Sequence, residues 1–134
     1  PFAASARLLT GRLLVVEDDR VNQRVIELLL EKIGIDCVVV ADGASSVEVA
    51  TLEPWDAVIM DCQMPGMDGF EATRRIRQKL GGRPLPIIAL TANAMTGDRE
   101  ACLAAGMNDF LAKPVRQEEL RSCLERWLPK PALK

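Results

Sequence analysis

The sequence predicts an α/β fold in which a parallel β-sheet carries helices on both faces. Short apolar runs recur five times along the chain, and a helical segment follows each of them. Strands that alternate with helices in this way are typical of parallel sheets. The first four runs are apolar along nearly their whole length, as expected of strands covered on both sides. At 134 residues the chain has the length of a single domain.

The five strand candidates lie between residues 13 and 111. They are Leu13–Val16, Val38–Val40, Ala57–Met60, Ile87–Leu90 and Asp109–Leu111. We expect residues 12–128 to form the domain. Residues 1–11 read as a linker or terminal extension, and residues 129–134 read as a tail.

The first expected helix has clear start and stop signals. Asp19 can cap its N-terminus, and Gly34 can end it. Between them, apolar residues at helical spacing form one stripe that ends in a lysine. The stripe consists of Val21, Val25, Leu28, Leu29 and Lys32.

A helix is also expected after each later strand. These helices are Ala44–Leu52, Gly69–Leu80, Asp98–Ala105 and Glu118–Leu128. Gly106 stops the third of them, and Pro129 follows the last. The last helix places its apolar residues on one face, which we expect to pack against the sheet.

Composition excludes several classes of function. The formal net charge is −2, so the chain lacks the overall basic character of a nucleic-acid-binding domain. The longest uncharged stretch, Pro84 to Gly97, is too short to span a bilayer. Residues 1–10 lack the apolar core of a secretory signal peptide. The chain has no histidine, which excludes a histidine-based triad, an imidazole zinc site and a phosphohistidine on this chain.

The four cysteines form no C-x-x-C motif. They are Cys37, Cys62, Cys102 and Cys123. We expect them to be reduced and to pack as small hydrophobic side chains. This pattern favours a cytosolic compartment.

Acidic residues, a hydroxyl and an amine follow the expected strands. They are Glu17, Asp18 and Asp19 after the first strand, Asp61 after the third, Thr91 after the fourth and Lys113 after the fifth. In open sheets of this kind ligands bind outside the carboxyl ends of the strands, so we expect these side chains to meet there. Carboxylates gathered at one edge repel one another by kilocalories and favour a bound cation. Oxygen ligands favour Mg²⁺ over zinc or copper.

A magnesium ion beside an aspartate, a lysine and a threonine indicates phosphoryl transfer. The ion and Lys113 would neutralise the oxygens of the incoming phosphoryl group, and Thr91 would donate a hydrogen bond to one of them. Asp61 would attack in line and become an acyl phosphate. Taken singly, Asp61 could be a turn residue, Thr91 a strand-end hydroxyl and Lys113 a surface charge. Their expected convergence at one edge favours the joint, functional interpretation.

Four segments resemble the receiver domains of two-component response regulators. They are VVEDD, VIMDCQMPGMDG, ALTANAM and FLAKP, and they occur in the order and spacing of that family. The resemblance implies a flavodoxin-like (βα)5 fold, doubly wound, with a five-stranded parallel sheet in the order 2-1-3-4-5. It also implies a phosphoacceptor in a His–Asp phosphorelay, with Mg²⁺ as cofactor. ALTANAM and DDRVNQ are most similar to receivers of hybrid sensor histidine kinases.

The resemblance also implies a role for each site residue. Asp61 is the phosphoacceptor, and the metal ligands are Glu17, Asp18, Asp61 and the backbone carbonyl of Gln63. The phosphate-binding and switch residues are Thr91, Ala92, Lys113 and Phe110. The peptide bond before Pro114 is expected to be cis.

The partner implied by the resemblance is a histidine kinase or a histidine phosphotransfer protein, which would donate the phosphoryl group and cause a partner-binding surface to change. The domain is not expected to be an enzyme beyond its own phosphoryl uptake and hydrolysis, although the parent chain can be a histidine kinase. We expect no DNA binding and no membrane contact by this domain. A cytoplasmic location, within a parent protein that can be membrane-bound, and a weak homodimer are further expectations.

Two other classes of function stay open at this point. A receiver-like interaction module would never take phosphate, and Mg²⁺-dependent fluorescence quenching, with Trp55 as the expected reporter, would separate it from a phosphoacceptor. A nucleotide or flavin binder can share the fold. However, the chain has neither G-x-x-x-x-G-K-[ST] nor G-x-G-x-x-G. The acidic run after the first strand would also repel a phosphate unless a metal intervened.

Overall fold

The computed structural model describes residues 9–92 and 97–128, which form five strands and five helices in strict alternation. The strands are β1 (Arg12–Val16), β2 (Asp36–Val40), β3 (Ala57–Asp61), β4 (Ile87–Thr91) and β5 (Asp109–Ala112). The helices are α2 (Arg20–Ile33), α3 (Gly43–Leu52), α4 (Gly69–Leu80), α5 (Gly97–Ala105) and α6 (Gln117–Trp127). Within the described residues, no helix is both long and apolar enough to cross a bilayer.

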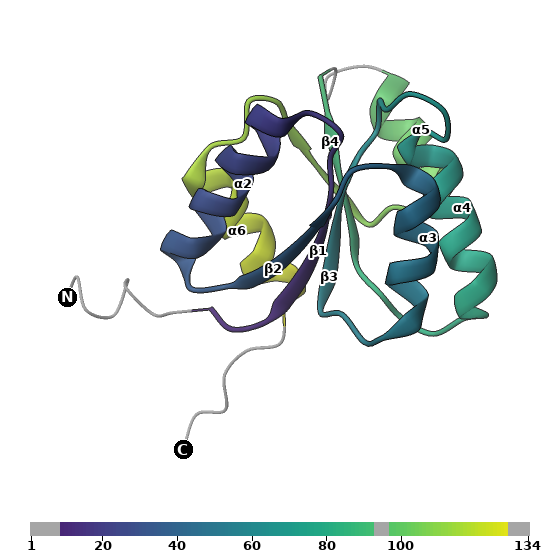
Figure 1. Ribbon diagram of the computed structural model, residues 1–134, viewed down its shortest axis with the longest axis horizontal. Helices are drawn as coiled ribbons and strands as arrows, with labels where there is room; N and C mark the ends of the chain where they lie inside the picture. The colour runs from purple at the N-terminus through teal and green to yellow at the C-terminus, as the bar shows by residue number, and fades with distance from the viewer. Residues whose placement is uncertain (1–8, 93–96, 129–134) are drawn as a thin grey trace.

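All strand pairs are parallel, and the strand order is β2-β1-β3-β4-β5. Helices α2 and α6 cover one face of the sheet, while α3, α4 and α5 cover the other (Figure 1). The predicted fold class, a doubly wound parallel sheet in the order 2-1-3-4-5, is therefore confirmed.

The central strands are apolar throughout because successive residues serve two different cores. In β1, Leu13 packs under α2 and α6, whereas Leu14 packs under α3, α4 and α5. In β3, Ile59 and Met60 divide between the two faces in the same way. Side chains alternate across a strand, so a sheet covered on both faces needs apolar residues at every position.

The flanking segments expected at residues 1–11 and 129–134 lie largely outside the described residues. Leu9 is buried in the core beneath α2 and α6. The Gly11 carbonyl accepts a hydrogen bond of 3.2 Å from the Asp36 amide. The chain thus already contacts the sheet before β1 begins.

Helix α2 has the predicted caps but buries a different stripe from the predicted one. The Asp19 carboxylate accepts a hydrogen bond from the Asn22 amide, and Gly34 ends the helix with φ 101°. The buried side chains are Ile26, Leu30 and Ile33. The helix carries two apolar stripes, and only one of them can face the sheet.

The predicted stripe is mostly open to solvent. Val21 is 70% exposed, and Val25 and Leu28 are 42% and 41% exposed. Leu29 alone among its apolar members packs partly against the core. The apolar stripe that the sequence pattern identifies is therefore not the face of α2 that packs against the sheet.

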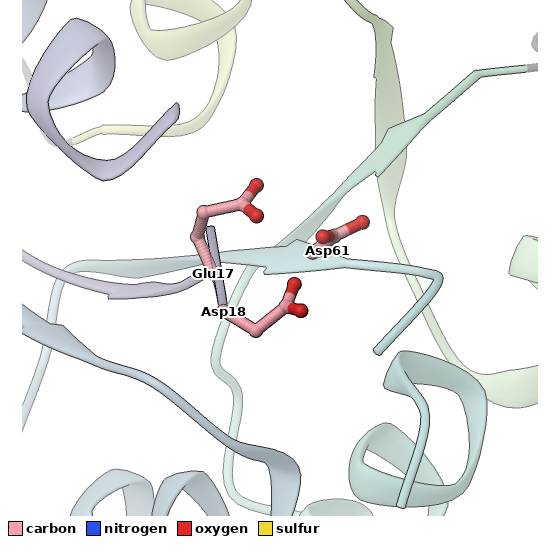
Figure 2. Close-up of side chains that lie close together, drawn as sticks. All are labelled: Glu17, Asp18 and Asp61. Atoms are coloured by element: carbon pink, nitrogen blue, oxygen red, sulfur yellow. The ribbon is translucent and has the colours of Figure 1, made fainter. Parts of the chain in front are cut away.

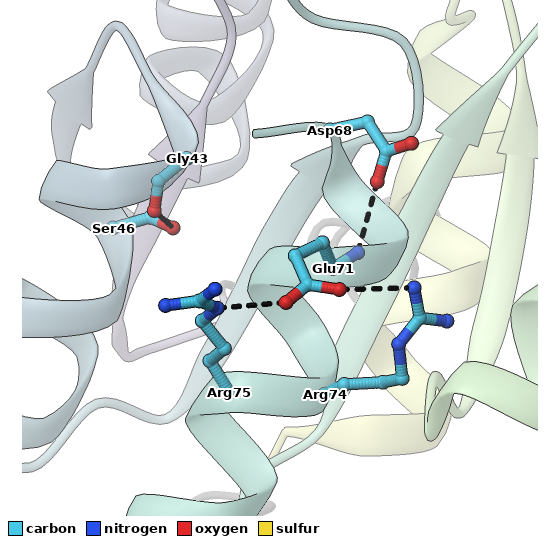
Figure 3. Close-up of polar contacts among 6 residues, drawn as sticks. All are labelled: Gly43, Ser46, Asp68, Glu71, Arg74 and Arg75. Carbon is cyan, nitrogen blue, oxygen red and sulfur yellow. Dashed lines mark hydrogen bonds and ion pairs between the residues drawn. The ribbon is translucent and has the colours of Figure 1, made fainter. Parts of the chain in front are cut away.

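Helix α4 is fixed at its start by the loop that follows β3. The Asp68 carboxylate caps it by accepting a hydrogen bond of 2.9 Å from the Glu71 amide, and Glu71 forms ion pairs with Arg74 and Arg75 (Figure 3). The Gly69 amide donates to the Cys62 carbonyl at 3.1 Å. A Cβ atom on Gly69 would lie 2.1 Å from the Asp61 carbonyl oxygen, so only glycine fits. This close approach fixes the backbone on which Asp61 sits.

Candidate functional site

The chemically active residues meet at the carboxyl edge of the sheet. Glu17 and Asp18 follow β1, Asp61 is the last residue of β3, and carboxylate oxygens of all three lie within 4.8 Å of one another. Figure 2 shows the three carboxylates converging from two neighbouring strands. Lys113 reaches the same point from beyond β5, with its Nζ 2.9 Å from Asp61 Oδ1 and 3.6 Å from Glu17 Oε1.

Thr91 and the residues around Lys113 are positioned by the sheet itself. Thr91 is the last residue of β4 and is 1% exposed. Its backbone carbonyl accepts a hydrogen bond of 3.0 Å from the Lys113 amide. The peptide bond between Lys113 and Pro114 is cis. Thr91 is thus carried by β4, next to the strand that ends at Asp61, and Lys113 follows β5, one strand further along the sheet.

Two of the three carboxylates are buried. Glu17 is 0% and Asp61 is 1% exposed, whereas Asp18 is exposed. Each buried carboxylate has one oxygen held by a backbone amide: Glu17 Oε2 accepts from Asp19, and Asp61 Oδ1 accepts from Gln63, both at 3.1 Å. The other two oxygens, Glu17 Oε1 and Asp61 Oδ2, accept no hydrogen bond from any residue that the structure describes. Buried acceptors without donors cost free energy, so these oxygens are suited to a ligand.

The electrostatics of the site follow from this burial. Burial raises the pKa of Glu17 to about 7; the Asp61 charge adds to the rise, while the Asp19 amide and Lys113 oppose it. Burial disfavours the ammonium form of Lys113, but the hydrogen bond and charge of Asp61 outweigh that effect and raise the pKa of Lys113. The site therefore has one ammonium against three carboxylates and has room for further positive charge.

The remaining predicted site residues surround this cluster. Gln63 is exposed and supplies the amide bound to Asp61, and Ala92 is exposed directly after β4. Phe110, in β5, is partly buried against the core on the side of α3, α4 and α5. The Arg99 guanidinium of α5 lies over its ring, 4.8 Å from the centroid. Asp19 has the capping role that the sequence assigns to it, and its amide also holds Glu17.

Sequence reasoning missed two contacts that support the site. The Gln23 side chain donates a hydrogen bond of 2.6 Å to the Glu17 carbonyl. The Val40 carbonyl accepts one of 3.1 Å from the Glu17 amide. Neither carries a sequence signal, because a glutamine in a first helical turn and a valine in a strand are ordinary residues.

Both tryptophans lie near the amino ends of strands, whereas the acidic cluster lies at the carboxyl ends. The Trp55 indole donates a hydrogen bond to the Val49 carbonyl, and Trp55 precedes β3, the strand that ends at Asp61. The Trp127 indole bonds to Asp109 at the start of β5. Trp55 is thus separated from Asp61 by the length of β3, and its fluorescence response to Mg²⁺ stays a prediction.

Comparison with known proteins gives a consistent set of matches. The family model described as "Response regulator receiver domain" matches residues 13–125. The sensor histidine kinase GacS of Pseudomonas protegens is 42% identical over 119 residues, which are 87% of this chain and 13% of GacS. The histidine-protein kinase BarA of Escherichia coli is 40% identical over 121 residues, which are 90% of this chain and 13% of BarA. The chain thus spans about an eighth of the length of these curated relatives.

Solved structures agree with the sequence matches. The receiver domain of a Pseudomonas aeruginosa sensor histidine kinase, with a magnesium ion coordinated in its active site cleft, is 52% identical with a TM-score of 0.81, covering 89% of this chain and 98% of that one. A chain of the Saccharomyces cerevisiae complex between the phosphotransfer protein Ypd1 and the receiver domain of Ssk1 is 30% identical, with a TM-score of 0.84. The match covers 90% of this chain and 90% of that one.

Proposed function

The chain belongs to the response regulator receiver family, and from this premise we propose that it accepts a phosphoryl group from a phosphohistidine onto Asp61 and thereby switches a partner-binding surface. The observation that carries the proposal is the convergence of buried Glu17 and Asp61 with the Lys113 ammonium, 2.9 Å from Asp61 Oδ1. A pure interaction module would have no need to keep two buried carboxylates beside one another, since burying charge is costly.

The residues present fit a magnesium ion. Glu17 Oε1 and Asp61 Oδ2 are buried oxygens without a donor among the described residues, and Asp18 adds a third carboxylate from the open side. The side chains of Glu17, Asp18 and Asp61 would hold the ion together with the Gln63 carbonyl. When bound, the ion would offset the negative charge of the phosphoryl oxygens.

Asp61 is arranged to act as the nucleophile. Its Oδ1 is engaged by the Gln63 amide and by the Lys113 ammonium, which orients the carboxylate and places it beside the cation that would meet an incoming phosphoryl group. In the transfer, a carboxylate oxygen forms a bond to phosphorus while the bond from phosphorus to the histidine nitrogen breaks. Lys113 would neutralise the transferred oxygens, and Thr91 would donate its hydroxyl hydrogen to one of them.

Mapping the phosphorylated residue tests the proposal directly. Incubation with a small-molecule phosphodonor, such as phosphoramidate, in Mg²⁺ is expected to give one phosphoryl group per chain. Because the product is an acyl phosphate, hydroxylamine should remove it, and the modified peptide should contain Asp61. A label that resists hydroxylamine, or one that maps to another peptide, would contradict the assignment.

Magnesium affinity is expected to fall as the pH drops below about 7, the pKa of Glu17 in the metal-free domain. Below this pKa Glu17 holds a proton that the ion must displace, so the dissociation constant should rise about tenfold per pH unit; above it the affinity should change little. Isothermal titration calorimetry in buffers on both sides of the pKa measures this. Glu17→Gln is the control, with weaker binding and no such pH dependence. A pH-independent affinity of the unmodified domain would refute the prediction.

We propose that the phosphoryl donor is a histidine kinase or a histidine phosphotransfer protein that docks on the exposed stripe of α2. Helix α2 begins two residues after Asp18, so its first turn stands beside the acidic edge. Val21 and Val25 are exposed there, and Val25 lines a cavity of about 80 Å³ together with Lys113 and Pro114. Exposed apolar side chains next to a reactive group suit a partner that must bring its own reactive group close.

Replacing Val21 with Asp is expected to slow phosphotransfer from the protein donor by about tenfold or more, because a charge would be placed in an apolar contact. Phosphorylation by the small-molecule donor should be unchanged. Leu52→Asp is a matched control, since Leu52 is 79% exposed on α3, on the other face of the sheet. If both variants slow phosphotransfer from the protein donor equally, the assignment of the docking surface to α2 is wrong.

The proposal extends to the parent protein. Since the curated relatives GacS and BarA are histidine kinases, we propose that this domain is the receiver of a hybrid histidine kinase and works in the cytoplasm, where ATP supplies the kinase. Its own chemistry would be limited to phosphoryl uptake and hydrolysis. A weak homodimer, and the absence of DNA and membrane binding, stay predictions for this domain.

A further inference from the structure

Two cysteines that are 40 positions apart in the sequence are in contact. Cys62 directly follows Asp61, and Cys102 lies within α5. Their sulfur atoms are 3.8 Å apart, and both residues are buried. They belong to the apolar cluster under α3, α4 and α5, which also holds Met60, Met64 and Met107. No disulfide joins them in the structure.

The other two cysteines lie in different surroundings. Cys37 is half-buried in β2, at the edge of the sheet. Cys123 lies within α6, on the opposite face of the sheet, and its thiol donates a hydrogen bond to Asp109 Oδ2 at 3.5 Å. Burial, with Asp109 beside it, raises the pKa of Cys123 to about 12, so this thiol is a poor nucleophile. Among the cysteines, only Cys62 and Cys102 have sulfur atoms in contact with each other.

We propose that Cys62 and Cys102 form a redox modification site, at which a hydroperoxide converts the two thiols into an intramolecular disulfide. In the first step the Cys62 sulfur attacks a peroxide oxygen, the O–O bond breaks, and a sulfenic acid and one water form from hydrogen peroxide. In the second step the Cys102 sulfur attacks the Cys62 sulfur, the S–O bond breaks, and the disulfide and a second water form. The two thiols lose two electrons in total, and the peroxide accepts both.

The geometry assigns a role to each cysteine. Cys62 helps to line a surface cavity of about 520 Å³ with Gln63, Met64 and Asp68, which gives a small peroxide a path toward its sulfur. Cys102 is 0% exposed and its sulfur contacts the Cys62 sulfur, so it is suited to the second step. A disulfide needs the sulfur atoms about 2 Å apart, which requires a further approach of about 2 Å.

The bond would attach α5 to the loop that begins next to Asp61. It would close a long loop that contains α4 and β4. The loop would lower the conformational entropy of the unfolded chain and so stabilise the folded domain. If Asp61 accepts phosphate, as proposed above, oxidation would also alter its phosphorylation. This consequence depends on the proposed function, whereas formation of the disulfide does not.

The test starts from the reduced domain, which is treated with hydrogen peroxide. The domain is then denatured in the presence of N-ethylmaleimide, which blocks the thiols that remain. Non-reducing peptide mass spectrometry is expected to find a peptide pair joined through Cys62 and Cys102, lighter by two hydrogen atoms and released by dithiothreitol. Cys37→Ser should form the same pair. Cys102→Ser should instead accumulate a sulfenic acid at Cys62, which dimedone traps. The oxidised domain should unfold at higher urea concentration than the reduced one.

Other outcomes overturn the proposal. If maleimide still labels Cys62 and Cys102 after the peroxide treatment, or if only Cys37 is oxidised, then Cys62 and Cys102 serve only as packing residues of the core. Should Cys102→Ser fold poorly, Cys102→Ala provides the same comparison. Because these measurements do not involve phosphate, a domain that forms the disulfide but is not phosphorylated would refute the proposed function alone. A domain that is phosphorylated but forms no disulfide would refute this inference alone.

Discussion

Replacing Asp61 with Asn is expected to abolish phosphorylation of the domain by a small-molecule donor in Mg²⁺. The amide has nearly the same shape as the carboxylate but lacks its charge and its nucleophilic oxygen. Removal of a nucleophile typically costs several orders of magnitude in rate, so we expect a decrease of at least about 1,000-fold. The rate of incorporation of labelled phosphate measures the effect.

The domain should still fold in this variant. Lys113 keeps Glu17 as a charge partner, since its Nζ lies 3.6 Å from Glu17 Oε1. Asp68→Asn is the matched control: Asp68 lies in the loop after β3, and asparagine caps a helix as well as aspartate does. That variant should be phosphorylated like the unmodified domain. Labelling of Asp61→Asn at an undiminished rate would remove Asp61 from its proposed role.

Replacing Lys113 with Met is expected to lower phosphorylation while strengthening Mg²⁺ binding. The ammonium is 2.9 Å from Asp61 Oδ1, where it would offset the charge of a transferred phosphoryl group, and its loss should slow transfer by about 100-fold. The same ammonium repels a divalent cation held by the same carboxylates. Its removal should therefore decrease the magnesium dissociation constant. Phosphodonor kinetics and calorimetry measure the two effects separately.

The same variant should be less stable without the ion. Lys113 is the ammonium that faces both buried carboxylates, and its side chain is 26% exposed. Removing one partner from a fully buried ion pair costs several kcal/mol; with this partial exposure we expect a loss of about 2 kcal/mol in the free energy of unfolding. Urea denaturation with and without Mg²⁺ checks this, and the ion should restore part of the loss. Lys79→Met is the control, because Lys79 is exposed on α4. Equal losses in the two variants would contradict the proposed role of Lys113.

A large part of the fold and of the site could be predicted from sequence because their signals are local. The Asp19 side chain caps the start of α2, and Gly34 ends the helix in a left-handed backbone conformation. Both predictions are confirmed. The continuous apolar runs predicted central strands because a strand between two layers of helices needs apolar residues on both sides. The parallel arrangement then led to the expectation that Glu17, Asp61 and Lys113 meet at one edge, and the structure places them there.

The sequence by itself thus determined the order of the elements and the residues that stand at the carboxyl ends of the strands. Only the tertiary structure decided which apolar stripe of α2 is covered, since Val21 and Ile26 are both apolar and the position of the helix on the sheet decides which of them is buried. It alone also placed Cys62 against Cys102 and Arg99 over Phe110. Such contacts join residues far apart in the sequence. They depend on how layers pack, and no periodicity along the chain records that packing.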